Sequence, residues 1–317
     1  MKNIILVILL IIIAAGIATA QTGGSPGEVV RVEANGGKGF GYPYYIYVPK
    51  GVREDKSKVR SLIVIPNNTG TINDDLGFHE ADVKKKMPQI GAFLSRLNAV
   101  VLMPVFPRSA TDHNVYTHSL DRDIFTTDRK EYKRLDLQLL AMIADTQKTL
   151  AEEGINLEKQ VLMQGYSASG MFVNRFVFLH PEAVKAAIIG APGGWAIAPV
   201  GKYANKELTF PAGVADLKQI SGRKFDVKKV REVPLLMILG DQDTNDAVPM
   251  GDAYDKTESE LVTGLFGKTP VERWPKTVEL YRQEKLNATF KLYPGVGHQM
   301  NKEMRDDMVA FLEKYVR

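Results

Sequence analysis

The chain has 317 residues, of which 44% are hydrophobic and 25% are charged. This is an ordinary globular composition, long enough for one large core or two small ones. The formal net charge of +4 is small and the basic residues are scattered, so we expect no nucleic-acid-binding surface. Because the chain has no cysteine, disulfides, thiolate chemistry and lipid-modified cysteines are excluded.

The first 20 residues have the features of an export signal. Lys2 gives a positive start, residues 4–17 are apolar, and Ala18-Thr19-Ala20 has the small-x-small pattern of a cleavage site. The alternative is an uncleaved anchor, but this apolar run is short for a span that needs ~20 residues. We therefore predict a signal peptide over 1–20 and a flexible lead-in over 21–28. The protein is then secreted or periplasmic, or membrane-anchored if the signal is not cleaved.

Short strand-like runs alternate with helical patterns along the rest of the chain. Strands are predicted over residues 29–33, 43–49, 61–65, 99–105, 161–163, 186–189, 235–239 and 288–293. The first two flank a glycine-rich turn at Asn35-Gly36-Gly37. Several later strands are apolar enough to be buried on both faces, which is typical of a parallel sheet covered by helices.

Helices are expected between these strands. They are predicted over residues 82–97, 128–152, 171–179, 272–285 and 301–315. Pro88 either kinks the first helix or marks its true start, and Asp128 with Glu131 suggests a capping box for the second. Residues 192–232 break the rhythm and are interpreted as an insertion or lid, with a short helix near 214–219. The alternation predicts an α/β fold with a mostly parallel central sheet, helices on both faces, and ligands beyond the strands' carboxyl ends.

A sharp turn joins the strand at 161–163 to the apolar helix at 171–179. It reads Gly165-Tyr166-Ser167-Ala168-Ser169-Gly170. A strand that turns directly into a helix leaves the residue at the turn strained and exposed at the sheet edge, and its near neighbours must be small. The usual G-x-S-x-G pattern has glycine where this chain has Ser169, which makes Ser169 a rival nucleophile to Ser167. Plain turn chemistry is an equally weighted alternative.

A serine nucleophile needs a base, and histidine is the usual one. Among the five histidines of the chain, only His298 comes directly after a predicted strand, in a loop that Gly295 and Gly297 allow to bend back. His180 lies at a predicted helix end, where compensation of the helix dipole is the better account.

The base in turn needs an acid that fixes its tautomer and stabilises its charge. Asp241, Asp243 and Asp246 crowd the loop after the strand at 235–239. We favour Asp243 as this acid, expect Asp241 to brace the turn, and hold Asp246 in reserve. Acidic clusters of this kind are also common as plain turn residues or cation ligands.

With these motifs in place, the chain resembles the α/β-hydrolase family from about residue 29 to its C-terminus. The resemblance is carried by residues 165–170, by 240–243 with Val248-Pro249 beyond, and by Tyr293-Pro294-Gly295-Val296-Gly297-His298. The chain order serine, aspartate, histidine is that of the family. The paired early strands resemble the secreted esterase branch that includes polyhydroxybutyrate depolymerases and feruloyl esterases.

The resemblance implies Ser167 as nucleophile, His298 as base and Asp243 as orienting acid. It also implies an oxyanion hole made by the backbone N–H of Ala168 and by a donor from the loop after the third strand. That loop usually reads His-Gly-Gly and here reads Pro66-Asn67-Asn68-Thr69-Gly70. The backbone of Asn68 is the predicted donor, with Asn67 or Thr69 as alternatives. The alternative is that Asn-Asn-Thr-Gly is a plain turn with no catalytic role.

The sequence therefore predicts an exported serine hydrolase that cleaves small-molecule or polymeric carboxylic esters through an acyl-enzyme. The alternatives are a serine peptidase of the same fold and a binding protein that has lost the chemistry. We expect no cofactor and no metal, because the polar loop at 106–127, with His113 and His118, fits no ligand spacing and is better explained as a substrate rim. Trp195 and Phe210 either line an acyl pocket or pack in the core. Membrane contact is expected only through the N-terminal segment, and the oligomeric state stays open.

Overall fold

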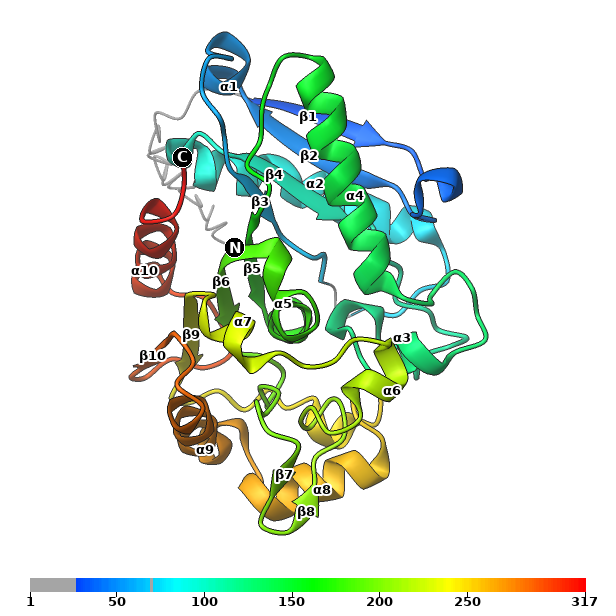
Figure 1. Ribbon diagram of the computed structural model, residues 1–317, viewed down its shortest axis with the longest axis vertical. Helices are drawn as coiled ribbons and strands as arrows, with labels where there is room; N and C mark the ends of the chain where they lie inside the picture. The colour runs from blue at the N-terminus through cyan, green and yellow to red at the C-terminus, as the bar shows by residue number, and fades with distance from the viewer. Residues whose placement is uncertain (1–26, 69–70) are drawn as a thin grey trace, which may run out of the picture.

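One mixed sheet forms the centre of the molecule. A computed structural model describes residues 27–68 and 71–317 (Figure 1). Its main sheet has eight strands in the order β1-β2-β4-β3-β5-β6-β9-β10. β1 pairs antiparallel with β2 and β2 with β4, whereas all the other pairs are parallel. The strands are β1 Gly27–Val32, β2 Tyr44–Pro49, β3 Leu62–Val64, β4 Val100–Pro104, β5 Val161–Tyr166, β6 Val184–Gly190, β9 Leu235–Gly240 and β10 Ala288–Tyr293.

All eight predicted strands are confirmed. The burial of β2 shows why its apolar sequence predicted a strand. Every residue of β2 is buried, with Tyr44 and Ile46 in one hydrophobic cluster and Tyr45 and Tyr47 in another. Successive side chains of a strand point to opposite faces, so both faces of the sheet must be covered.

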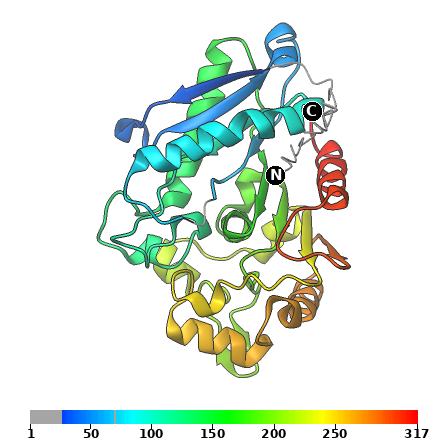
Figure 2. The same ribbon diagram turned by 180° about the vertical axis from the view of Figure 1, so that it is seen from behind.

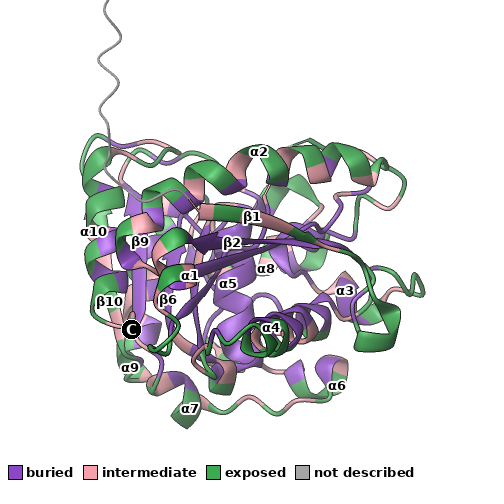
Figure 3. Cartoon of the chain, turned by 90° about the horizontal axis from the view of Figure 1, so that it is seen from above, coloured by how far each residue is buried: buried purple, intermediate pink, exposed green. Residues whose placement is uncertain are grey.

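Helices supply that cover (Figure 3). α2 and α10 lie on one face, and α4, α5, α7 and α9 lie on the other. In the view from behind, α2 (cyan) and α10 (red) lie on the side nearer the reader (Figure 2). The helices are α1 Lys50–Glu54, α2 Leu76–Leu94, α3 Asp123–Thr126, α4 Leu135–Glu152, α5 Ala168–Leu179, α6 Leu217–Ser221, α7 Val227–Arg231, α8 Lys256–Phe266, α9 Pro270–Gln283 and α10 Lys302–Glu313.

Helix boundaries differ from expectation where capping overrides periodicity. α2 begins six residues early because the Asp75 side chain accepts a hydrogen bond from the Gly77 N–H, and Pro88 lies in its interior. The predicted capping box at Asp128 is wrong. α4 begins only at residue 135, after Arg134 adopts a left-handed conformation with φ 55°, which ends the preceding turns and redirects the chain.

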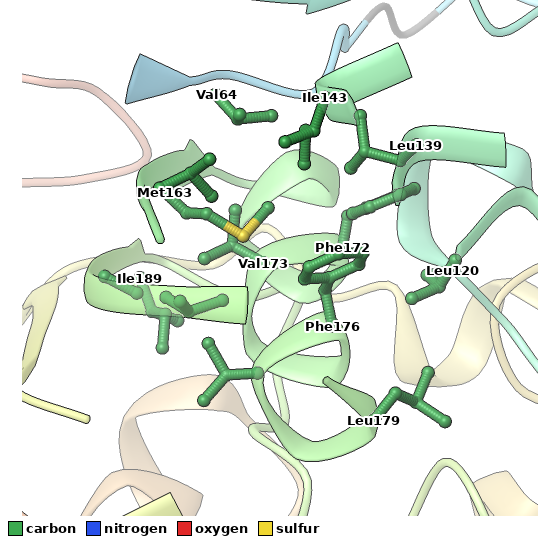
Figure 4. Close-up of a cluster of buried hydrophobic side chains, with 14 of the residues drawn as sticks. Val64, Leu120, Leu139, Ile143, Met163, Phe172, Val173, Phe176, Leu179 and Ile189 are labelled. Atoms are coloured by element: carbon green, nitrogen blue, oxygen red, sulfur yellow. The ribbon is translucent and has the colours of Figure 1, made fainter. Parts of the chain in front are cut away.

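The helix α5 is buried all round and anchors the centre of the fold. Its Phe172, Val173 and Phe176 pack with Met163 of β5 and Ile189 of β6 (Figure 4). Every residue of α5 is buried, as expected for a helix that is almost wholly apolar. The turn that precedes α5 is therefore fixed between the middle strands of the sheet and this core.

The segment 192–232 follows β6, as predicted, and packs against the main domain. It contains the small hairpin β7 Lys202–Tyr203 and β8 Lys206–Glu207, then α6 and α7. The ring of Trp195 stacks on Phe266 with centroids 4.1 Å apart, and Phe210 is fully buried against Phe125. Both aromatic residues therefore have packing roles.

The N-terminal predictions fall largely outside the described residues. The signal peptide at 1–20 lies outside them, as does most of the lead-in at 21–28. Gly27 and Glu28, the last two residues of that lead-in, already belong to β1. Within residues 27–68 and 71–317, no helix has the length and apolarity needed to cross a bilayer.

Candidate active site

The turn between β5 and α5 holds Ser167 in a strained conformation. Its φ of 62° and ψ of −128° lie in a region that non-glycine residues rarely adopt. The turn is tight because strand and helix nearly touch. A Cβ on Gly165 would lie 2.1 Å from the Ser169 carbonyl oxygen, and one on Gly170 would lie 2.3 Å from that of Gly190. The predicted need for small residues is confirmed at both glycines.

The loop after β10 places His298 against Ser167. Its Nε2 lies 2.9 Å from the Ser167 Oγ, and its Nδ1 lies 2.9 Å and 3.1 Å from the two carboxylate oxygens of Asp243. A proton on Nδ1 donated to Asp243 leaves Nε2 free to accept the serine proton. The Asp243 side chain is 1% exposed and that of His298 22%, so the acid is shielded while the base remains accessible.

The structure separates the three candidate acids. Asp241 accepts a hydrogen bond of 2.7 Å from the Gly295 N–H, so it braces the histidine loop, whereas the sequence predicted that it braces its own turn. Asp246 receives two hydrogen bonds, of 2.8 Å and 2.7 Å, from the buried guanidinium of Arg273. Of the three, Asp243 is the one that reaches His298.

This protein resembles known proteins in its structure. Neither protein-family models nor curated proteins match the sequence. Poly(aspartic acid) hydrolase-1 from Sphingomonas sp. KT-1 is 17% identical with a TM-score of 0.56, over 92% of this chain and 98% of that one. LpqC, a poly(3-hydroxybutyrate) depolymerase from Bordetella parapertussis, is 16% identical with a TM-score of 0.55, over 92% and 90%. A thermostable esterase is 16% identical with a TM-score of 0.51, over 92% and 64%. The chain has the α/β-hydrolase fold.

In the α/β-hydrolase fold, the nucleophile stands at the turn between a central strand and the helix that follows it, which is the position of Ser167 here. The rival candidate Ser169 has a different environment. The Ser169 Oγ accepts a hydrogen bond of 3.0 Å from the Tyr166 N–H and lies 2.8 Å from the Tyr166 carbonyl oxygen. The residue is only 5% exposed. Its hydroxyl therefore stabilises the turn instead of facing a base.

The loop after β3 is tied down by amide side chains. Asn67 donates to the Phe106 carbonyl at 2.7 Å and accepts from the Phe106 N–H at 3.1 Å. The Asn68 amide donates to the Tyr166 carbonyl at 3.0 Å, and Lys86 donates to the Asn68 carbonyl at 2.7 Å. Asn68 therefore lies beside the turn, as predicted, while Asn67 has a bracing contact. Thr69, the other alternative, lies outside the described residues.

Ala168 is the first residue of α5. The N–H groups of a helix's first turn have no acceptor within the helix, and they point in the direction that favours negative charge. Ala168 thus follows Ser167 directly, and the Asn68 side chain contacts Tyr166; their role as the pair of oxyanion donors stays a prediction.

The loop at 106–127 is less exposed to solvent than its polar sequence suggested. Residues 115–121 are buried, and Arg175 of α5 donates to the Ser119 carbonyl at 3.0 Å. Burial lowers the pKa of His118 to about 3, so its ring is neutral next to Asn67, 3.1 Å away. Much of this loop is therefore a core segment that supports the turn. No group of three or more potential metal ligands occurs within the described part of the chain.

Two residues of the site were not predicted. The Tyr166 ring lies 5.3 Å from the His298 ring. Arg273 bonds to both carboxylate oxygens of Asp246, so that this carboxylate is paired with Arg273 and not with His298. The sequence offered no signal for Arg273, which lies 27 residues from its partner. Tyr166 was visible as the residue before the serine, but its ring direction depends on the folded turn.

Proposed function

We propose that this protein is a serine hydrolase with Ser167 as nucleophile, His298 as general base and Asp243 as orienting acid. The observation that carries the proposal is the run of contacts from the strained Ser167 through His298 to the buried Asp243, with 2.9 Å at each step. A hydroxyl, an imidazole and a carboxylate in this sequence of contacts are what acyl transfer by serine requires.

In the proposed reaction, the Ser167 Oγ attacks the carbonyl carbon while His298 takes its proton at Nε2. Asp243 stabilises the resulting imidazolium. The N–H groups of Ala168 and Asn68 hold the negative oxygen of the tetrahedral intermediate. His298 then passes the proton to the leaving group, and a water molecule activated in the same way releases the acid from the acyl-enzyme.

Carboxylic esters are the proposed substrates. The support comes from fold relatives, which include a poly(3-hydroxybutyrate) depolymerase and a thermostable esterase. An alcohol leaving group also makes fewer demands on the site than an amine, since it leaves with less help from the acid. The N-terminal 20 residues, with the pattern of a signal peptide, support the further proposal that the enzyme acts outside the cytoplasm.

Labelling with a fluorophosphonate probe tests the nucleophile. The mature protein is treated with the probe, the modified peptide is mapped, and Ser167→Ala and Ser169→Ala are compared with the parent. We expect the label on Ser167, absent from Ser167→Ala and retained by Ser169→Ala. A label on Ser169, or none on folded protein, would overturn the assignment. Initial rates on p-nitrophenyl butyrate and on a matched p-nitroanilide then test the preference for esters over amides.

A further inference from the structure

A cavity of about 450 Å³ lies beside the turn, with residues of α2 and α10 in its wall. Residues from the ends of β3, β4 and β5, from α2, from the first turn of α5 and from the start of α10 line it. Asn68, Tyr166 and Ser169 line it as well, whereas Ser167 and His298 do not. It therefore lies next to the candidate active site and shares Asn68 and the turn with it, but the two side chains that exchange a proton in the proposed reaction lie outside its lining.

The body of the cavity is aliphatic. Ile65, Ile90, Met103 and Met300 line it. Phe93 and Met300 at its edge are 36% and 39% exposed, although most large apolar side chains of the protein are buried. A volume in this range and a wall of this kind fit a small organic molecule with a hydrocarbon part.

The charged groups of the cavity have one sign. Lys86 and Arg305 line it, and no aspartate or glutamate does. Lys86 already bonds to the Asn68 carbonyl and to Asp82, and one Arg305 nitrogen bonds to the Met300 carbonyl at 2.6 Å. Ammonium and guanidinium groups have several donors each, so both remain able to bind an anion. This favours a carboxylate.

Two buried polar atoms in the wall have no partner among the described residues. They are the Gln164 side-chain oxygen and the Tyr166 hydroxyl. Gln164 stands in β5, on the side of the strand that faces the cavity. Buried polar groups are nearly always hydrogen-bonded, and an amide oxygen can only accept. A ligand that satisfies Gln164 must therefore bring a donor, and the Gln164 side chain must turn toward the cavity to meet it, because its oxygen is now buried.

We propose that this cavity binds an aliphatic carboxylic acid that carries a hydroxyl group. The carboxylate lies at Lys86 and Arg305, the chain lies against the aliphatic wall, and the hydroxyl donates to Gln164. The site is separate from Ser167, and its existence does not depend on the proposed hydrolysis.

Calorimetric titration of the mature protein with three probes tests the ligand class. The probes are 8-hydroxyoctanoate, octanoate, which lacks the hydroxyl, and octane-1,8-diol, which lacks the charge. We expect one site per chain, binding the hydroxy acid roughly fivefold more tightly than octanoate and roughly tenfold more tightly than the diol. No binding, or equal binding of acid and diol, would overturn the proposal.

Variants assign the binding to this cavity. Lys86→Met should weaken both acids by roughly tenfold, whereas Lys85→Met, an exposed neighbour on the same helix, should leave both unchanged. Gln164→Leu should remove the advantage of the hydroxy acid over octanoate. Ile90→Trp fills the cavity and should abolish binding. This variant still tests the site if Gln164→Leu does not fold. Acid binding that survives Lys86→Met and Ile90→Trp would place the acid elsewhere and refute the site. Free acids bind without being hydrolysed. The binding result therefore stands by itself even if Ser167 is not labelled by the fluorophosphonate probe.

Discussion

The molecule contains two histidine–aspartate pairs whose contacts are almost equal in length. His298 lies 2.9 Å from Asp243, and His180, at the end of α5, lies 2.8 Å from Asp136 at the start of α4. The surroundings differ. Both His180 and Asp136 have fully buried side chains, and Asp136 also accepts two hydrogen bonds from Arg134. His180 lies at the end of α5, as predicted, and its bond to Asp136 is a contact that the sequence did not predict.

The difference shows that a histidine–aspartate contact alone does not define a catalytic base. His298 has a serine hydroxyl at its second nitrogen and a partly exposed ring. His180 has its second nitrogen buried without a partner among the described residues, and the Phe176 ring lies 5.0 Å away. A base needs a reacting group within reach of its free nitrogen. The first pair is therefore arranged for proton transfer and the second for holding α4 against α5.

The largest expected effect separates the two histidines by activity. His298→Ala should lower kcat/KM on an ester by roughly 10⁴-fold, because the serine loses its base. Its melting temperature should stay close to that of the parent. His180→Ala should keep the activity of the folded fraction but lower the free energy of unfolding by about 2 kcal/mol. Ester kinetics with urea unfolding of both variants measures this, and an active His298→Ala would remove the proposed base.

Replacing the acids tests which carboxylate orients the base. Asp243→Asn should lower kcat on the order of 10³–10⁴-fold by favouring the wrong histidine tautomer. Asp246→Asn should reduce stability through Arg273 and leave kcat within about threefold of the parent. Steady-state kinetics of the two proteins, matched for folded fraction by circular dichroism, gives the answer. The reverse ranking would assign the acid to Asp246.

The buried pair makes a prediction of its own about stability. Asp136→Asn leaves the Arg134 charge without its carboxylate partner and should lower the free energy of unfolding by about 3 kcal/mol. Asp128→Ala, at an exposed residue of the segment before α4, should change it by less than about 0.5 kcal/mol. Urea titration followed by tryptophan fluorescence measures both. Equal values for the two variants would mean that the pair contributes no stability.

The smallest effect concerns another of the buried carboxyl groups, that of Glu258 in α8. Burial raises its pKa from 4.5 to about 7. Between these values the folded protein keeps a proton that the unfolded chain has lost, so the free energy of unfolding falls as the pH rises through this window and stays low above it. Glu258→Gln should therefore stabilise the protein by about 1–2 kcal/mol at pH 8 and not at pH 4.

Glutamine can still accept the hydrogen bond of the capping box at Asp255, which makes Glu258→Gln a conservative change. Glu260→Gln, at an exposed residue of the same helix, is the matched control. Melting temperatures at the two pH values decide the outcome. A gain at pH 4 as large as the gain at pH 8 would show that the carboxyl is not protonated by burial.

Much of the fold could be predicted from local patterns. The strands were readable because buried runs and turns alternate along the chain, and the order of Ser167, Asp243 and His298 followed from their positions after strands. The start of α4 was not readable, because it depends on the left-handed backbone of Arg134. The helix α8 was missed although Asp255 and Glu258 form its capping box, a signal that the sequence did contain.

Contacts across long sequence distances were beyond local patterns. The Arg273–Asp246 bond and the His180–Asp136 bond join residues 27 and 44 positions apart. Their partners are chosen by how α9 and α4 pack, and no spacing rule encodes that choice. The bonds of the loop after β3, from Lys86 and Asn67, depend on packing in the same way. Sequence reasoning therefore predicted the candidate site, and the packed structure shows which of its candidate residues contact one another.

The close approach at Gly165 and Gly170 also bears on how this protein can change by mutation. A side chain at either position would meet backbone atoms, which cannot move aside as a flexible side chain can. Replacement of Ser167 or His298, by contrast, removes chemistry while leaving the chain path intact. Descendants of this sequence can thus lose the reaction and keep the shape, whereas a substitution at either glycine threatens both. In a survey of all single substitutions, these two glycines should be intolerant even when selection acts on folding alone.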